Sequence, residues 1–384
     1  MKLLFVDFEL PQLLKDAEFP GGGWAVQLRQ LLIGLAQAGH HSGVLTWRGA
    51  NAYVGAQSVC DLVETYDPAR GIPKLKHFTN FLPALYSAAR AYRPDVILQS
   101  CANVQTGTMA LVARGLGIPF VHRIANDIDA DGRNAQYLNS SDRIGFRYGL
   151  KNSCLVICQN SYQLEHIRRR FPVKPAGVIH NAIRIPDSVE NLARRTERNY
   201  VAWLATFARR KNLPLLLEVA KSLPEVEFRI AGALPGEAAH APTLLALDEL
   251  KRLKNVTFLG YLRRDQVWEF LNGATALLST SDFEGFSNTI LESLAVGTPV
   301  VLRSNIDPDA IIGENDLGLV AHNEHDLVRC VREICAMNAD HYESVRQRCR
   351  NHVETHHTPI AAVSKLISIL EPVVQRSSWK ALPQ

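Results

Sequence analysis

Residues 282–301 read DFEGFSNTILESLAVGTPVV and follow an apolar run at 274–278. Apolar side chains at 286, 290, 291 and 294 recur with the spacing of one helix face, so we expect a helix over 286–295. The apolar run before it predicts a buried strand, and 299–302 predicts the next one. A strand, a helix and a strand in this order form one unit of a parallel sheet.

The same alternation continues in both directions along the chain. Helix-like segments at 24–38, 82–92, 104–116, 213–222 and 264–272 separate short apolar runs. The further strands are expected at 2–7, 44–47, 95–99, 119–123, 154–158, 177–179, 200–204, 227–231, 256–259 and 318–320. This pattern predicts the α/β class, with doubly wound parallel sheets covered by helices on both faces.

The length of the chain predicts two domains, because 384 residues exceed an ordinary single core. Pro186 and a charged run before Arg198 are typical of a linker. We expect an N-terminal Rossmann-like domain over 1–182, a C-terminal Rossmann-like domain over 183–355, and a helix and tail over 356–384 that pack back on the first domain. Ligands of such sheets lie at the carboxyl ends of the strands, so a central cleft between the domains is the expected site.

Two carboxylates and a helix start make residues 284–292 a candidate ligand site. Glu284 lies on the loop after a strand, and Glu292 follows eight residues later, about two turns into the expected helix. Their oxygens can accept hydrogen bonds from sugar hydroxyls. The backbone N–H groups of Phe286, Ser287 and Asn288 open the helix, where unpaired donors favour phosphate. For Glu292 alone, a solvated acid on an amphipathic helix is the alternative.

Three consecutive glycines follow the first expected strand and precede a helix. Gly21, Gly22 and Gly23 let the backbone approach a ligand closely, and the helix start behind them favours an anion. We therefore take Gly22 and Gly23 as candidate ligand contacts, with a plain turn as the alternative. The GxGxxG fingerprint of dinucleotide-binding proteins does not occur here.

The string from Glu284 to Val301 closely resembles the EGF…LEAMAxGxPVV signature of family 4 glycosyltransferases. VIHNAI at 178–183 is similar to the family's VIPNGID segment, and the resemblance extends over essentially the whole chain. It implies the GT-B fold, in which two Rossmann-like domains face each other, with the domain over 1–182 on the acceptor side and the domain over 183–355 binding the nucleotide sugar. It also implies that Glu284 contacts the donor sugar and that Glu292 binds the ribose.

The resemblance further assigns the diphosphate to a Lys and an Arg after the first strand of the second domain. Lys211 matches the Lys, but the Arg position falls on Thr206. Arg209 or Arg210 could supply the missing cation, because arginine suits bidentate phosphate contact. Solvated loop charge is the alternative for both residues.

A second departure from the family lies after the strand expected at 119–123. The family commonly has a His there, whereas Ala125, Asn126 and Asp127 occupy the site in this sequence. Asp127 or Asn126 is expected to face the donor sugar and the acceptor instead, and we assign Asp127, together with Glu284 and Lys211, as a candidate catalytic residue. Asp127, Asp129 and Asp131 alternate as in a calcium loop, but Leu138 stands where that loop needs Glu, so no metal site is expected.

The resemblance implies a retaining hexosyltransferase that uses a nucleotide-diphosphate sugar of the UDP or GDP type, without a prosthetic group. A glycan or lipid-linked acceptor, within surface polysaccharide or lipid-linked glycan synthesis, is the implied partner. A nucleotide-sugar epimerase is one alternative. A non-catalytic homologue that binds a nucleotide or a partner is another, because the Arg and His of the family are missing.

Composition excludes some other classes of partner. The net charge is only +4, which does not indicate nucleic acid binding.

Seven irregularly spaced cysteines are typical of reduced thiols, so we expect a cytoplasmic protein. The basic segments 142–151 and 166–171 predict a peripheral contact, either with anionic lipid at the inner face of the membrane or with a lipid-linked acceptor. Ordinary surface helices are the alternative.

Overall fold

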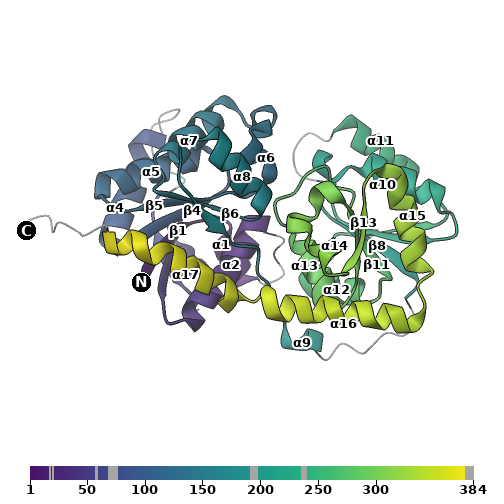
Figure 1. Cartoon of the computed structure of the whole chain (residues 1–384). Helices are drawn as coiled ribbons and strands as arrows, with labels where there is room; N and C mark the ends of the chain where they lie inside the picture. Colours follow the sequence, from purple (N-terminus) through teal and green to yellow (C-terminus); the bar gives the residue numbers. More distant parts are fainter. Residues whose placement is uncertain are drawn as a thin grey trace, which may run out of the picture. The chain divides into compact units, whose positions relative to one another are not determined.

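The structure, a computed structural model, describes residues 1–16, 19, 21–56, 59–67, 77–190, 198–234 and 240–376. The chain divides into two compact units. The first comprises Met1–Ala182 and the chain from Pro359 onward, and the second comprises Ile183–Thr358. Both units are drawn in Figure 1, and each is described by itself below.

The first unit is built on a seven-stranded parallel sheet with the order β3-β2-β1-β4-β5-β6-β7. The order reverses between β1 and β4, so helices that follow these strands cover opposite faces. The strands are β1 (Lys2–Val6), β2 (His41–Thr46), β3 (Asp61–Glu64), β4 (Val96–Ser100), β5 (Phe120–Arg123), β6 (Leu155–Cys158) and β7 (Pro175–Val178).

Alternate residues of β1 enter two different cores of the first unit. Leu3 and Phe5 pack with α2 and α17, whereas Leu4 and Val6 pack with α4 and α5. This alternation is what a strand covered on both faces requires. The helices of the unit are α1 (Leu10–Lys15), α2 (Gly23–Gln37), α3 (Ala50–Val54), α4 (Leu82–Tyr92), α5 (Val104–Leu116), α6 (Asp127–Asp131), α7 (Ser140–Lys151), α8 (Ser161–Arg170) and α17 (Pro359–Arg376), with a π turn at His77–Phe81 and a 3₁₀ turn at Arg133–Gln136.

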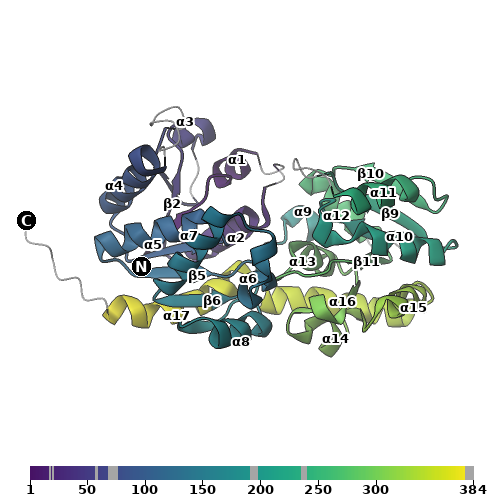
Figure 2. The same cartoon turned by 90° about the horizontal axis from the view of Figure 1, so that it is seen from above.

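The last helix of the chain, α17, belongs to the first unit. Its apolar residues join the core formed by α2 and β1, and Figure 2 shows it, in yellow, running along this unit. Gly34 of α2 makes the close approach possible, because a Cβ there would lie 2.4 Å from the carbonyl oxygen of Pro359. The tail expected after this helix lies outside the described residues.

The second unit repeats the architecture with a six-stranded parallel sheet in the order β10-β9-β8-β11-β12-β13. Its order reverses between β8 and β11. The strands are β8 (Tyr200–Leu204), β9 (Glu227–Ala231), β10 (Val256–Gly260), β11 (Ala276–Leu278), β12 (Val300–Arg303) and β13 (Gly318–Ala321). The helices are α9 (Asp187–Glu190), α10 (Leu213–Ser222), α11 (Ala241–Leu250), α12 (Arg264–Asn272), α13 (Asn288–Ala295), α14 (Ile311–Glu314), α15 (Glu324–Cys335) and α16 (Ala339–His356), with 3₁₀ turns at Arg209–Lys211, Ser304–Ile306 and Pro308–Ala310.

The two parallel sheets confirm the predicted α/β class, with two local corrections. The helix expected over 286–295 begins at Asn288, because Ser287 is extended with φ −73° and ψ 128°. Glu292 is therefore little more than one turn into α13. The strand β3 was not predicted. Among the described residues, no helix is both long enough and apolar enough to cross a bilayer.

Candidate functional site

Two loops of the second unit meet at the carboxyl edge of its sheet. One follows β8 and contains Lys211, and the other follows β11 and contains Glu284. These strands pair directly, with Val201 opposite Ala276, and the strand order reverses between them. Such a reversal is where doubly wound sheets bind ligands. The topology therefore brings the predicted cation and the predicted carboxylate to one place.

Lys211 and Glu284 form a largely buried ion pair. The Nζ of Lys211 donates to Oε1 of Glu284, and the two side chains are only 13% and 11% exposed. Burial would raise the pKa of Glu284, but the charges of Lys211 and Arg210 and the hydrogen bond from Lys211 hold it below its ordinary value. Glu284 is thus an ionised acceptor at neutral pH, stabilised by the charges of Lys211 and Arg210.

The loop that carries Lys211 is fixed by a short hydrogen-bond relay. The indole Nε1 of Trp203 donates to Oγ1 of Thr280 at 3.0 Å, and this hydroxyl donates to the carbonyl oxygen of Lys211 at 2.8 Å. Asn212 caps α10 and also donates to Oδ1 of Asp282 at 2.8 Å. These bonds connect the two loops, so Lys211 and Glu284 are positioned before any ligand binds.

The two candidate arginines in this loop differ. Arg210 is half-buried, its charge acts on Glu284, and its Nε has no hydrogen-bond partner among the described residues. Arg209 is exposed at the start of the 3₁₀ turn, and Thr206, at the family's Arg position, is exposed as well. Arg210 is therefore the better placed substitute for the missing arginine.

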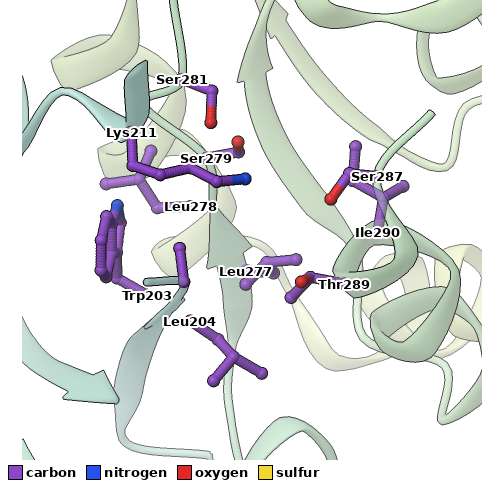
Figure 3. A pocket seen from close by; sticks show the side chains of 11 residues that line it. Trp203, Leu204, Lys211, Leu277, Leu278, Ser279, Ser281, Ser287, Thr289 and Ile290 are labelled. Carbon is purple, nitrogen blue, oxygen red and sulfur yellow. The ribbon is translucent and has the colours of Figure 1, made fainter. Parts of the chain in front are cut away.

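A small pocket lies between these loops and α13. Its lining includes Trp203, Lys211, Ser279, Ser281 and Ser287, and Figure 3 shows the amino group of Lys211 extending toward its centre. Ser287 is the N-cap of α13. A helix start beside a lysine favours a phosphate group. The side chain of Phe286 is buried in the core instead, so only its backbone could serve the predicted role.

Glu292 lies further along α13 and contacts α12. Its Oε1 is 3.8 Å from Nη1 of Arg264, and its side chain is 14% exposed. Burial raises its pKa to about 7, although the charge of Arg264 opposes the shift. A carboxyl group in this state exchanges its proton near neutral pH, which distinguishes it from Glu284.

The glycine loop of the first unit already holds a carboxylate. Gly22 is the N-cap of α2 and Gly23 its first residue. The N–H of Gly22 donates to Oε2 of Glu9 at 2.6 Å, and a Cβ at Gly22 would lie 2.9 Å from that oxygen. A side-chain carboxylate of the chain itself therefore contacts the glycine loop.

Asp127 is buried at the start of α6 and is held by α8. Its Oδ1 accepts from the side-chain amides of Asn160 and Gln163, both at 2.9 Å. Asn160 also caps α8 by accepting from the N–H of Gln163 at 2.8 Å. The amides orient the carboxylate, which suits a group that must stay in one position.

Asp129 and Asp131, the two acids that alternate with Asp127, have separate partners. Asp129 accepts from Nδ2 of Asn134 at 3.2 Å, and burial raises its pKa to about 7. Asp131 pairs with Arg133 at 2.7 Å and accepts from the hydroxyl of Tyr162 at 3.0 Å.

A buried arginine in the first unit was not predicted. Arg123, at the carboxyl end of β5, is 4% exposed and donates through Nη2 to Oδ1 of Asn181 at 2.7 Å. Its guanidinium lies 5.7 Å from the centroid of the Trp24 ring, and its Nε has no partner among the described residues. Burial lowers its pKa to about 10. A cation inside an apolar strand run is the signal that could have identified it.

Each half of the chain matches the model of a known protein family. Residues 21–185 match the model of Glycosyltransferase Family 4, and residues 185–352 match that of Glycosyl transferases group 1.

The relatives and solved structures agree with these families. A human GDP-Man:Man(3)GlcNAc(2)-PP-Dol alpha-1,2-mannosyltransferase is 25% identical over 53% of this chain and 46% of its own length, so the chain spans about half of that relative. Sucrose-phosphate synthase from Thermosynechococcus elongatus superposes with a TM-score of 0.77 at 17% identity, over 98% of this chain and 100% of that one. HepE of Anabaena, in complex with UDP and glucose, superposes with a TM-score of 0.67 at 15% identity, over 97% and 100%.

These structures share the GT-B fold of two parallel-sheet units. Since the two family models together span residues 21–352, the chain belongs to the family 4-like glycosyltransferases.

Proposed function

We propose that this chain transfers a hexosyl group from a nucleoside-diphosphate sugar to a hydroxyl of a glycan or lipid-linked acceptor, with retention of configuration. One observation carries the proposal most directly. The second unit holds a lysine, an arginine and an ionised glutamate beside a helix start, at the strand-order reversal of its sheet. Cations and backbone donors are what a departing diphosphate requires.

In this proposal Lys211 and Arg210 stabilise the negative charge that develops on the diphosphate as the glycosidic bond breaks. The N–H groups at the start of α13 add to that stabilisation. Glu284 gives up part of its contact with Lys211 when the donor enters and then accepts hydrogen bonds from sugar hydroxyls. No second carboxylate is needed as a nucleophile, because the leaving phosphate takes the acceptor proton during front-face attack.

Glu292 is proposed to bind the ribose hydroxyls, and Asp127, Gly22 and Gly23 to face the sugar and the acceptor. Support for Asp127 is its fixed orientation between two amides. Support for the glycine loop is its contact with a carboxylate oxygen, which an anionic or hydroxyl-rich ligand could replace.

The donor nucleotide is the main choice left to experiment. The human relative is named for GDP-mannose, and the HepE structure contains UDP. A lipid-linked acceptor is proposed because that human relative is named for a dolichol-linked glycan.

The test is a panel of UDP- and GDP-sugars assayed for nucleoside diphosphate release, with and without a lipid-linked acceptor fraction. Acceptor-dependent release with one donor, and an anomeric configuration in the product that matches the donor by NMR, would support the proposal. Conversion of the donor sugar without an acceptor would instead support an epimerase. Binding without release, with every acceptor tried, would support a non-catalytic homologue.

A further inference from the structure

A basic pocket in the first unit plays no part in the proposed transfer. It has a volume of about 360 Å³ and lies between α7, the turn after α6 and the residues that follow α8. Four cations line it, namely Arg143, Arg147, Lys151 and Arg170. Phe146, Phe171 and Val173 supply apolar surface. A volume of this size lies within the range of small-ligand sites.

The packing of α7 directs three of these cations into the pocket. Arg143, Arg147 and Lys151 are spaced by four residues and therefore share one face of the helix. On the opposite face, Gly145 and Gly149 pack against α5, where a Cβ would lie 2.6 Å from Cα of Val104 and 2.4 Å from the carbonyl oxygen of Thr106 respectively. This contact fixes the rotation of α7, so the cation face cannot turn away from the pocket.

Nothing in the described part of the chain neutralises these charges. None of the four cations forms an ion pair there, and the neighbouring acids have other partners. Asp131 pairs with Arg133, Glu165 pairs with Arg169, and Asp142 accepts from the N–H of Val104 at 2.8 Å.

The fold itself does not account for all of these cations. Like charges at i and i+4 destabilise a helix. The helix dipole accounts for Lys151 and Arg170, which lie in the last turns of α7 and α8. It does not account for Arg143, near the start of α7, where a cation is disfavoured.

We propose that the basic pocket binds a phosphate ester. Arginine side chains bind phosphate oxygens in pairs, and the apolar lining accommodates the organic part of the ligand. The ester could belong to the headgroup of an anionic phospholipid or to a soluble metabolite. The proposal does not depend on the proposed function, because the residues of this pocket all belong to the first unit and those of the pocket in Figure 3 to the second.

The experiment compares the wild-type chain with the double variant Arg143→Gln, Arg147→Gln. The matched control is Arg114→Gln, Arg168→Gln, which removes the same charge from exposed positions of the same unit that do not line the pocket. Two probes distinguish the sources of phosphate. One is co-sedimentation with vesicles of 30% phosphatidylglycerol in phosphatidylcholine, and the other is calorimetric titration with glycerol 1-phosphate.

At least one probe should bind the wild type and the control alike, and the pocket variant at least about tenfold more weakly. Loss of vesicle binding alone would identify a lipid headgroup, and loss of glycerol 1-phosphate binding would identify a soluble ester. A melting temperature of the variant at or above that of the wild type would exclude misfolding as the cause. Equal losses in the variant and the control, or no binding of either probe by the wild type, would overturn the proposal.

Discussion

The site around Lys211 in the second unit and the basic pocket in the first unit differ in whether their cations have acidic partners. In the second unit, Lys211 is paired with Glu284, and both side chains are nearly buried. In the first unit, the cations of the basic pocket are more exposed, and none of them has an acidic partner within the described residues. The difference shows two ways to bind an anionic ligand. A cation can give up its acidic partner within the chain when the ligand arrives, or it can be left unpaired until the ligand binds. Mutations should therefore change stability in opposite directions at the two sites.

The largest effect is expected for Lys211→Ala. It should lower turnover about 1,000-fold, because the departing diphosphate loses its main cation. It should also destabilise the second unit by about 3 kcal/mol, since Glu284 is left as a buried, unpaired carboxylate. Steady-state kinetics and thermal unfolding measure the two effects.

The double variant Lys211→Ala, Glu284→Ala is the control for that result. It should regain much of the lost stability without regaining turnover, because no unpaired charge remains. If Lys211→Ala kept turnover within about tenfold of wild type, the electrostatic role given to this lysine would be wrong.

The variant Glu292→Gln should show that the protonation of Glu292 depends on pH near neutrality, unlike that of Glu284. Burial raises the pKa of Glu292 from 4.5 to about 7, so its ionisation costs stability as the pH rises through that range. The variant should therefore match the wild type near pH 4.5 and exceed it by up to about 3 kcal/mol at pH 8. Unfolding by denaturant at both pH values measures this. A constant difference across the range would show that the carboxyl does not titrate there.

The affinity for the donor should also depend on the protonation of Glu292. Ionised Glu292 is the better acceptor for ribose hydroxyls, so the KM for the donor should rise as the pH falls below about 7 in the wild type. This dependence should be lost in Glu292→Gln.

Arg210→Gln should have an intermediate effect. The charge of Arg210 helps to keep the pKa of Glu284 low, and its Nε has no partner in the described part of the chain. We expect turnover to fall about tenfold, which corresponds to about 1.4 kcal/mol of lost transition-state stabilisation, as one supporting cation is removed. Arg209→Gln, the exposed neighbour, is the matched variant and should change turnover less than twofold. Equal losses would place both arginines in the site.

The smallest effect is expected for Arg147→Gln in the basic pocket. Removal of one charge relieves repulsion from Arg143 and Lys151 along α7, so stability should increase by about 0.3–0.5 kcal/mol. The gain should disappear in 1 M salt, which screens exposed charges. Thermal unfolding at two salt concentrations tests this, and a loss of stability would contradict the contrast between the sites.

The sequence predicted the elements better than their contacts. Strands such as β6 and β8 were located because their apolar runs are continuous. The strand β3 was missed because its four residues, DLVE, begin and end with an acid. The start of α13 was placed too early because Phe286, an apolar residue at helical spacing, is buried from the preceding loop.

The site was predictable only where one segment contains it. Glu284, Ser287 and Glu292 stand on one string and could be identified from it. The contact of Glu292 with Arg264, the network around Asp127 and the burial of Arg123 depend on elements distant in the sequence. Such pairings arise from tertiary packing, and a periodic pattern does not encode them.

The position of α17 determines the order in which the molecule can be completed during synthesis. The core around α2 and β1 needs Val363, Leu366 and Leu370, which leave the ribosome after the entire second unit. The second unit is continuous in sequence and can fold as soon as it emerges, whereas the first must wait with an apolar face of α2 exposed. The half that begins the chain is therefore the last to finish folding, and a fragment that ends at Ala182 would leave that face uncovered.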